Sequence, residues 1–237
     1  MAQRLLLISN STNYGEEYLA YTKPHIKEFL GENVREVLFI PYAGVSMSYL
    51  EYTNKVKLVF KELGYELKSI HEESNPKAAV EKAEAIIVGG GNTFHLVQMM
   101  HETGIMEPIR KKVQDGTPFI GWSAGSNVAC PSLKTTNDMP IIQPSSFDTL
   151  GLVPFQINPH YTDGVIPNHN GETREERIRE FLVVNPETVV VGLKEGTMLW
   201  IEGEKVQMIG SKTVKIIKKD QPTLEFDKNV NLDFLLK

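Results

Sequence analysis

Apolar and polar positions alternate along the first half of the chain in blocks of two kinds. The first kind is a short, nearly continuous apolar run, typical of strands buried on both faces of a parallel sheet; such runs cover residues 4–9, 34–42, 65–70, 85–88 and 119–122. The second kind has apolar residues at helical spacing and covers residues 18–30, 49–63, 95–101 and 105–114. Because strands and helices alternate, we expect an α/β fold with a doubly wound, mainly parallel sheet and helices on both faces.

The second half of the chain begins with an irregular stretch over residues 131–155, rich in Pro, Ser, Thr and Asn. We expect this stretch to form the wall of a site rather than a linker. A short strand over 155–161, a charged amphipathic helix over 171–182 and a buried strand over 188–193 follow. Residues 198–226 then alternate around two glycines, which predicts antiparallel hairpin strands at the C-terminal edge of the sheet. A chain of 237 residues fits a single domain over residues 1–237.

Composition narrows the possible partners. The net charge is −5, and basic residues gather only over 212–219, where they alternate with apolar residues as in a half-buried strand. We therefore expect no nucleic-acid partner. The single cysteine, Cys130, excludes an internal disulfide and is expected to be a buried core thiol. The first apolar run is too short for a signal peptide and no run has transmembrane length, so we expect a cytoplasmic protein with no membrane partner.

The strongest chemical signal is the stretch over residues 117–127. The apolar run ends at Trp122, its last residues begin the spacing Gly121-x-Ser123-x-Gly125, and a helical pattern follows. A serine on a strained strand-to-helix turn is tolerated only when its neighbours are small, and this spacing is that of a nucleophile elbow. A glycine-rich turn without chemistry is the alternative. In the functional interpretation, the N–H of Ala124 points to the anion that forms beside Ser123.

A second glycine-rich stretch, Gly89-Gly-Gly91, also joins an apolar strand to a helix, which Asn92 or Thr93 can cap. It matches neither a Walker sequence nor G-x-G-x-x-G, so we expect no nucleotide cofactor, and no metal site is indicated. Elbow hydrolases complete the oxyanion hole with an N–H from another strand-to-helix loop. Gly90 and Gly91 are therefore the expected partners of Ala124.

A serine nucleophile needs a base and an acid. Ligands of open α/β sheets lie outside the carboxyl ends of the strands, where we also expect His160 and Glu195. His160 follows a proline at a strand end and is the expected base. Glu195 follows a core strand and is the favoured acid, while Asp138, in the irregular stretch, is the runner-up. The order of the residues along the chain does not decide between them.

Five motifs together resemble the peptidase E family of α-aspartyl dipeptidases. They begin at Gly89 (GGGNTF), Ile120 (IGWSAG), Thr135 (TTNDMPI), Gln156 (QINPH) and Gly171 (GETRE), and the resemblance runs from the first strand to at least Glu195. It implies a class I glutamine amidotransferase-like fold and a serine peptidase that cleaves Asp-X dipeptides without metal. It also implies Ser123 as nucleophile, His160 as base and Glu195 as the triad acid.

The resemblance leaves the substrate pocket to be assigned. An aspartyl side chain needs a cation, and Arg174 is our hypothesis, because a guanidinium can pair with a carboxylate through two hydrogen bonds; a solvated helix face is the alternative. Asn92 is a second candidate substrate-binding residue, and Asp138 is a candidate for the substrate's α-ammonium. A hydrolase of aspartyl polymers, similar to cyanophycinase, and a catalytically silent binding protein on the same fold remain as other functions. The expected partner is a small peptide, and the expected state is a monomer or a small homo-oligomer.

Overall fold

The computed structural model describes residues 2–164, 170–228 and 230–237. Its larger sheet has seven strands in the order β3-β2-β4-β5-β1-β8-β9. The first five of these are parallel, whereas β8 runs antiparallel to β1 and β9 antiparallel to β8. The strands are β1 (Arg4–Ile8), β2 (Glu36–Ile40), β3 (Glu66–Ser69), β4 (Ile86–Val88), β5 (Phe119–Trp122), β8 (Thr197–Glu202) and β9 (Lys205–Gly210). The mainly parallel α/β fold with an antiparallel hairpin at its edge is thus confirmed.

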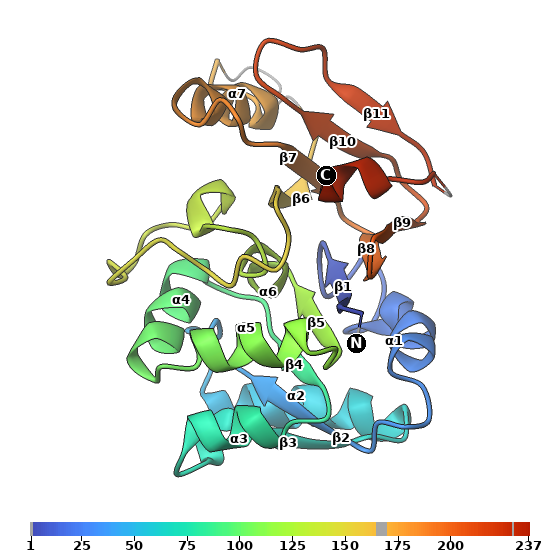
Figure 1. The fold of residues 1–237 in the computed structure, drawn as a ribbon, viewed down its shortest axis with the longest axis vertical. Coiled ribbons are helices and arrows are strands. Elements are labelled where there is room, and N and C mark those ends of the chain that lie inside the picture. The colour runs from blue at the N-terminus through green and yellow to red at the C-terminus, as the bar shows by residue number, and fades with distance from the viewer. Residues whose placement is uncertain (1, 165–169, 229) are drawn as a thin grey trace.

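Helices cover both faces of this sheet, as Figure 1 shows. Leu5 and Leu7 of β1 pack in one core with the helices α3 to α6, whereas Leu6 and Ile8 pack in another with α1 and α2. Successive residues of a strand point to opposite faces, so a continuous apolar run fills both cores. The helices are α1 (Lys23–Leu30), α2 (Tyr49–Glu62), α3 (Pro76–Lys82), α4 (Thr93–Glu102), α5 (Met106–Gln114) and α6 (Ala124–Asn127).

A second sheet of four strands, in the order β11-β10-β7-β6, lies beside the first and is drawn at the top of Figure 1. It contains β6 (Gln156–Tyr161), β7 (Val190–Lys194), β10 (Val214–Ile217) and β11 (Leu224–Phe226). Strands β6 and β7 are parallel, and the other pairs are antiparallel. Helix α7 (Arg174–Val184) packs Ile178 and Leu182 against this sheet. The sequence pattern predicted these strands but not their separation, because buried strands look alike whichever sheet they join.

Smaller departures from the expected elements have local causes. The helical pattern over 18–30 divides into a 3-10 helix and the shorter α1, which has Pro24 in its first turn. Helix α3 was not expected; Pro76 occupies its first turn, and the Asn75 side chain accepts a hydrogen bond from the N–H of Ala78 (3.1 Å). No helix in the described ranges has the length and apolar character needed to cross a membrane. The 3-10 helices are Ala20–Thr22, Ile70–Glu72, Leu133–Thr135 and Asp233–Leu236.

Candidate active site

Ser123 stands on the turn between β5 and α6 with φ 54° and ψ −113°, a backbone conformation that non-glycine residues rarely adopt. Its N–H donates to the carbonyl of Ile8 on the neighbouring strand (3.0 Å). The flanking glycines are required by close backbone contacts. A Cβ at Gly121 would lie 2.2 Å from the Gly125 carbonyl oxygen, and one at Gly125 would lie 2.1 Å from that of Val88. Crowding of the backbone therefore fixes the turn and leaves the Ser123 side chain exposed to the pocket.

A chain of two hydrogen bonds connects Ser123 to His160 and Glu195. The distance from His160 Nε2 to Ser123 Oγ is 2.9 Å, and that from His160 Nδ1 to Glu195 Oε1 is 2.7 Å. The side chains of His160 and Glu195 are 39% and 48% exposed. Serine, imidazole and carboxylate in this order can transfer a proton from the hydroxyl to the ring while the carboxylate orients the ring. The runner-up acid, Asp138, makes no hydrogen bond to His160 among the described residues.

The backbone of His160 is strained and anchored to the larger sheet. Its φ is 52°, at an irregularity in the pairing of β6 with β7. Its N–H donates to the hydroxyl of Ser9 (3.0 Å), which in turn donates to the carbonyl of Leu193 on β7 (2.7 Å). Ser9 directly follows β1 and is fully buried. This serine, which the sequence did not single out, therefore holds the second sheet against the first at the point where the base lies.

Asn10 makes a similar connection to the acid. Its side-chain oxygen accepts a hydrogen bond from the N–H of Gly196, the residue after Glu195 (2.8 Å), and from the Tyr21 hydroxyl (2.6 Å). Ser9 and Asn10 both lie at the carboxyl end of β1. Polar side chains directly after a buried strand were the sequence signal that could have identified both residues.

The glycine loop after β4 lies against Ser123. A Cβ at Gly90 would be 3.0 Å from that of Ser123, and one at Gly91, where φ is 136°, would be 2.1 Å from the Ala43 carbonyl oxygen. Within the described part of the chain, the N–H groups of Gly90, Gly91 and Ala124 donate to no backbone or side-chain acceptor. Three such donors beside a nucleophile can stabilise an oxyanion.

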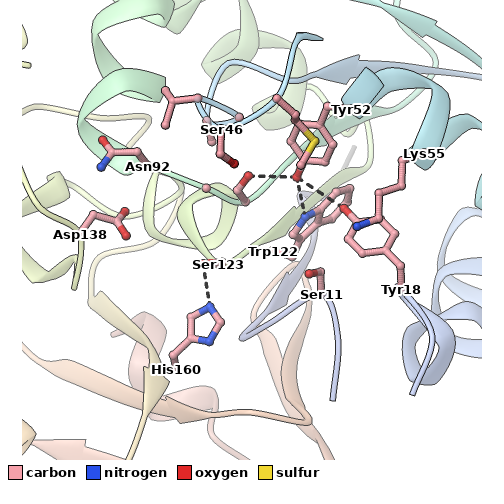
Figure 2. A pocket seen from close by; sticks show the side chains of 16 residues that line it. Ser11, Tyr18, Ser46, Tyr52, Lys55, Asn92, Trp122, Ser123, Asp138 and His160 are labelled. Atoms are coloured by element: carbon pink, nitrogen blue, oxygen red, sulfur yellow. Dashed lines mark hydrogen bonds between the residues drawn. The ribbon is translucent and has the colours of Figure 1, made fainter. Parts of the chain in front are cut away.

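Tyr52 of α2 fixes this loop from behind. Its hydroxyl donates to the carbonyl of Gly90 (3.0 Å) and accepts from Trp122 Nε1 (3.2 Å), as the dashed lines in Figure 2 show. Burial raises the pKa of the Tyr52 hydroxyl, so it stays protonated and able to donate. In a trans peptide the C=O and the following N–H point in opposite directions. The bond to Gly90 therefore directs the Gly91 N–H away from Tyr52.

The side chains of Asp138 and Asn92 both form hydrogen bonds to the first turn of α4. Asp138 Oδ2 accepts hydrogen bonds from the N–H (2.7 Å) and hydroxyl (2.6 Å) of Thr93 and from the Thr136 hydroxyl (3.0 Å). Asn92 caps the helix by accepting from the N–H of His95 (3.1 Å) and donates to the Met139 carbonyl (2.9 Å). Both residues also line the pocket that contains Ser123 and His160, so they can contact a ligand as well as hold the irregular wall.

The pocket around Ser123 has a volume of about 530 Å³. Arg174 does not line it. Arg174 borders a neighbouring cavity of about 230 Å³ and donates a hydrogen bond to Asn137 Oδ1, and Asp138 is common to the linings of both cavities. Burial, together with the charge of Arg177, lowers the pKa of the Arg174 guanidinium; with an ordinary value far above neutrality, this group stays charged.

An α/β fold with a serine at a strand-to-helix turn, hydrogen-bonded to a histidine that is itself hydrogen-bonded to a glutamate, is typical of serine hydrolases. Residues 5–209 match the family described as Peptidase family S51. The chain belongs to this family and is a peptide hydrolase.

The similarity to relatives named peptidase E supports the assignment of this chain as a serine dipeptidase. The protein of that name from Nostoc sp. is 57% identical over 237 residues, covering 100% of this chain and 98% of the relative. That of Salmonella newport is 46% identical over 223 residues, covering 94% and 97%. The fold is shared with a crystal structure of a peptidase from an acI-B1 Actinobacterium, with a TM-score of 0.69 at 20% identity and coverage of 98% and 97%.

Proposed function

We propose that this protein is a serine dipeptidase that hydrolyses dipeptides with an N-terminal aspartate, with Ser123 as nucleophile, His160 as general base and Glu195 as the triad acid. The observation that carries the proposal is the unbroken hydrogen-bond chain from Glu195 through His160 to Ser123, with distances of 2.7 and 2.9 Å. The specificity for aspartate rests on the peptidase E relatives and on the five sequence motifs.

The reaction is an acyl transfer in two halves. Ser123 Oγ attacks the peptide carbonyl while His160 Nε2 takes the hydroxyl proton, and the N–H groups of Gly90 or Gly91 and of Ala124 bind the oxyanion. His160 then returns the proton to the leaving amine, and the C–N bond breaks to give an acyl-enzyme. In the second half His160 activates a water molecule that releases aspartate. Glu195 keeps the imidazole oriented throughout and stabilises its protonated form.

The two charged groups of the substrate's aspartyl residue have matching partners at the Asp138 end of the pocket. Asp138 accepts the α-ammonium, Asn92 forms the adjacent wall, and Arg174 binds the aspartyl side-chain carboxylate across the boundary between the two cavities. We further propose that the protein acts in the cytoplasm as one domain, as a monomer or small homo-oligomer, on small peptides and without a nucleic-acid or membrane partner.

Fluorophosphonate labelling and a dipeptide panel test the proposal. We expect wild-type protein to be labelled and to hydrolyse Asp-Leu in preference to Glu-Leu, Asn-Leu, Ala-Leu and an aspartyl polymer, and Ser123→Ala to lose labelling and about 10⁴-fold or more in kcat. Labelling that survives in Ser123→Ala would contradict the proposal, as would faster hydrolysis of the aspartyl polymer than of Asp-Leu. For the Arg174 assignment, Arg174→Met should lose more activity on Asp-Leu than on Ala-Leu. Arg35→Met is the control, because Arg35 is exposed and lines neither cavity. Equal losses on the two dipeptides in Arg174→Met would exclude Arg174.

A further inference from the structure

Lys55 occupies the end of the active-site pocket that lies opposite Asp138. It projects from α2 and lines the same pocket as Ser123 and His160. Figure 2 shows Asp138 and Asn92 on one side of the nucleophile and Lys55 on the other. Among the described residues that line this pocket, Lys55 is the only lysine or arginine. The pocket therefore has a negative end and a positive end, with the reacting serine between them.

The ammonium of Lys55 is held in place without being neutralised. Its Nζ lies 4.0 Å from the centroid of the Tyr18 ring, a cation–π contact. The Tyr18 ring packs edge-on against Trp122, with 6.4 Å between ring centroids, so the aromatic support is fixed by the core. No carboxylate in the described ranges lies within ion-pair distance of Lys55. A cation that is oriented by an aromatic face and has no acidic partner can accept an anionic ligand.

We propose that Lys55 binds the C-terminal carboxylate of the dipeptide, the carboxylate of the leaving residue. This inference rests on the proposed function and deepens it. A dipeptide is a short zwitterion whose ammonium and carboxylate lie on either side of its single peptide bond, and the pocket presents Asp138 and Lys55 on either side of Ser123. In a longer peptide, a neutral amide would stand where Lys55 meets the carboxylate. Lys55 would thus favour dipeptides over longer chains.

The simplest alternative is that Lys55 is an ordinary exposed lysine of a helix surface. Lys57, two residues further along α2, is also exposed but does not line the pocket. It therefore provides a matched control, because Lys55→Met and Lys57→Met remove the same charge from the same helix. A general effect of net charge on an anionic ligand would appear equally in both variants.

Binding measured in a Ser123→Ala background tests the inference without turnover. The dissociation constants of Asp-Leu, Asp-leucinamide and Asn-Leu are determined by calorimetry, with and without Lys55→Met, Lys55→Arg or Lys57→Met. We expect Lys55→Met to weaken Asp-Leu and Asn-Leu about tenfold, the size of one charge-assisted hydrogen bond, and to leave Asp-leucinamide unchanged. Lys55→Arg should stay within about threefold of the parent, because arginine also pairs with carboxylates.

Three results would overturn the inference. Lys55→Met could behave like Lys57→Met, it could weaken all three ligands equally, or it could weaken Asp-leucinamide but not Asn-Leu, in which case Lys55 binds the aspartyl side chain instead. The proposed function is decided separately, by whether the wild-type protein hydrolyses Asp-Leu. Binding of Asp-Leu that depends on Lys55, without hydrolysis of Asp-Leu, would refute the proposed aspartyl dipeptidase activity and leave the proposed carboxylate site supported.

Discussion

The nucleophile and its base are built on two different sheets by two different kinds of contact. Ser123 follows a strand of the larger sheet, where neighbouring backbones are so close that no Cβ fits at Gly121 or Gly125. His160 lies in β6 of the second sheet, Glu195 directly follows β7 of that sheet, and both side chains are partly exposed. The N–H of His160 donates to the Ser9 hydroxyl, and the N–H of Gly196, next to Glu195, donates to the Asn10 side-chain oxygen. The half of the site around Ser123 is held by steric crowding of the backbone, and the half around His160 by polar contacts that cross between the two sheets.

The two halves nevertheless share one feature, a strained backbone at the functional residue. The φ angles of Ser123 and His160 are 54° and 52°. Conformations of this kind cost on the order of 1–3 kcal/mol each and persist only where the surroundings enforce them. Because the enforcing contacts differ, substitutions around Ser123 should act mainly on stability, whereas substitutions around His160 should also act on the chemistry.

Gly125→Ala should give the largest effect on stability. The new Cβ would lie 2.1 Å from the Val88 carbonyl oxygen, so β4 and α6 must separate, which we expect to destabilise the protein by about 3 kcal/mol. Gly151→Ala is the control, since a Cβ there meets no atom within 4 Å and bears only the strain of φ 57°, about 1 kcal/mol. Urea unfolding measures both. Equal losses in the two variants would show that crowding does not hold the turn.

Glu195→Gln should give the next largest effect, on the chemistry alone. An amide cannot stabilise the imidazolium that forms on His160, and we expect kcat to fall about 10²-fold, less than for a fully buried acid because this carboxylate is 48% exposed. Asp138→Asn should instead raise KM about tenfold and change kcat little, because Asp138 is proposed to bind the α-ammonium. Steady-state kinetics with Asp-Leu separates the two. The opposite pattern would make Asp138 the triad acid.

The sequence predicted the nucleophile half well because its signals are local. An apolar run, small residues and a helical pattern within eleven residues define the turn around Ser123, and glycines at fixed spacing mark the close backbone contacts. His160 and Glu195 could be selected because strand ends gather ligand-binding groups. The structure brings these three residues together, and their catalytic roles stay predictions until the variants are measured.

The contacts between the sheets could not be predicted, because nothing local encodes them. The patterns of β6 and β7 show that these strands are buried, but not that β8 takes the place beside β1. From the sequence alone, Tyr52 looks like a core aromatic of α2 and Lys55 like a solvated residue of the same helix. Only the tertiary structure places the glycine loop and Ser123 beside them. Arg174 shows the converse, because the chemistry of its guanidinium suggested a place in the substrate pocket, but its side chain borders the neighbouring cavity.

Ser9→Ala tests the polar contacts around His160, because it removes the hydroxyl that connects the His160 backbone to Leu193. Of the variants considered, it should have the smallest effect. The change leaves the His160 N–H and the Leu193 carbonyl without their partner, which we expect to lower the unfolding free energy by about 1–2 kcal/mol. Because the strained His160 backbone loses an anchor, kcat should also fall about fivefold.

Ser69→Ala provides the control for Ser9→Ala. Ser69 is also fully buried and hydrogen-bonded, to Thr53 and His71, but it lies at the end of β3, at the far edge of the larger sheet. We expect Ser69→Ala to lose similar stability while keeping its kcat. If both serine variants lost stability and kept the wild-type kcat, the polar contacts would stabilise the junction between the sheets without positioning the base, and the difference drawn between the two halves of the site would fail.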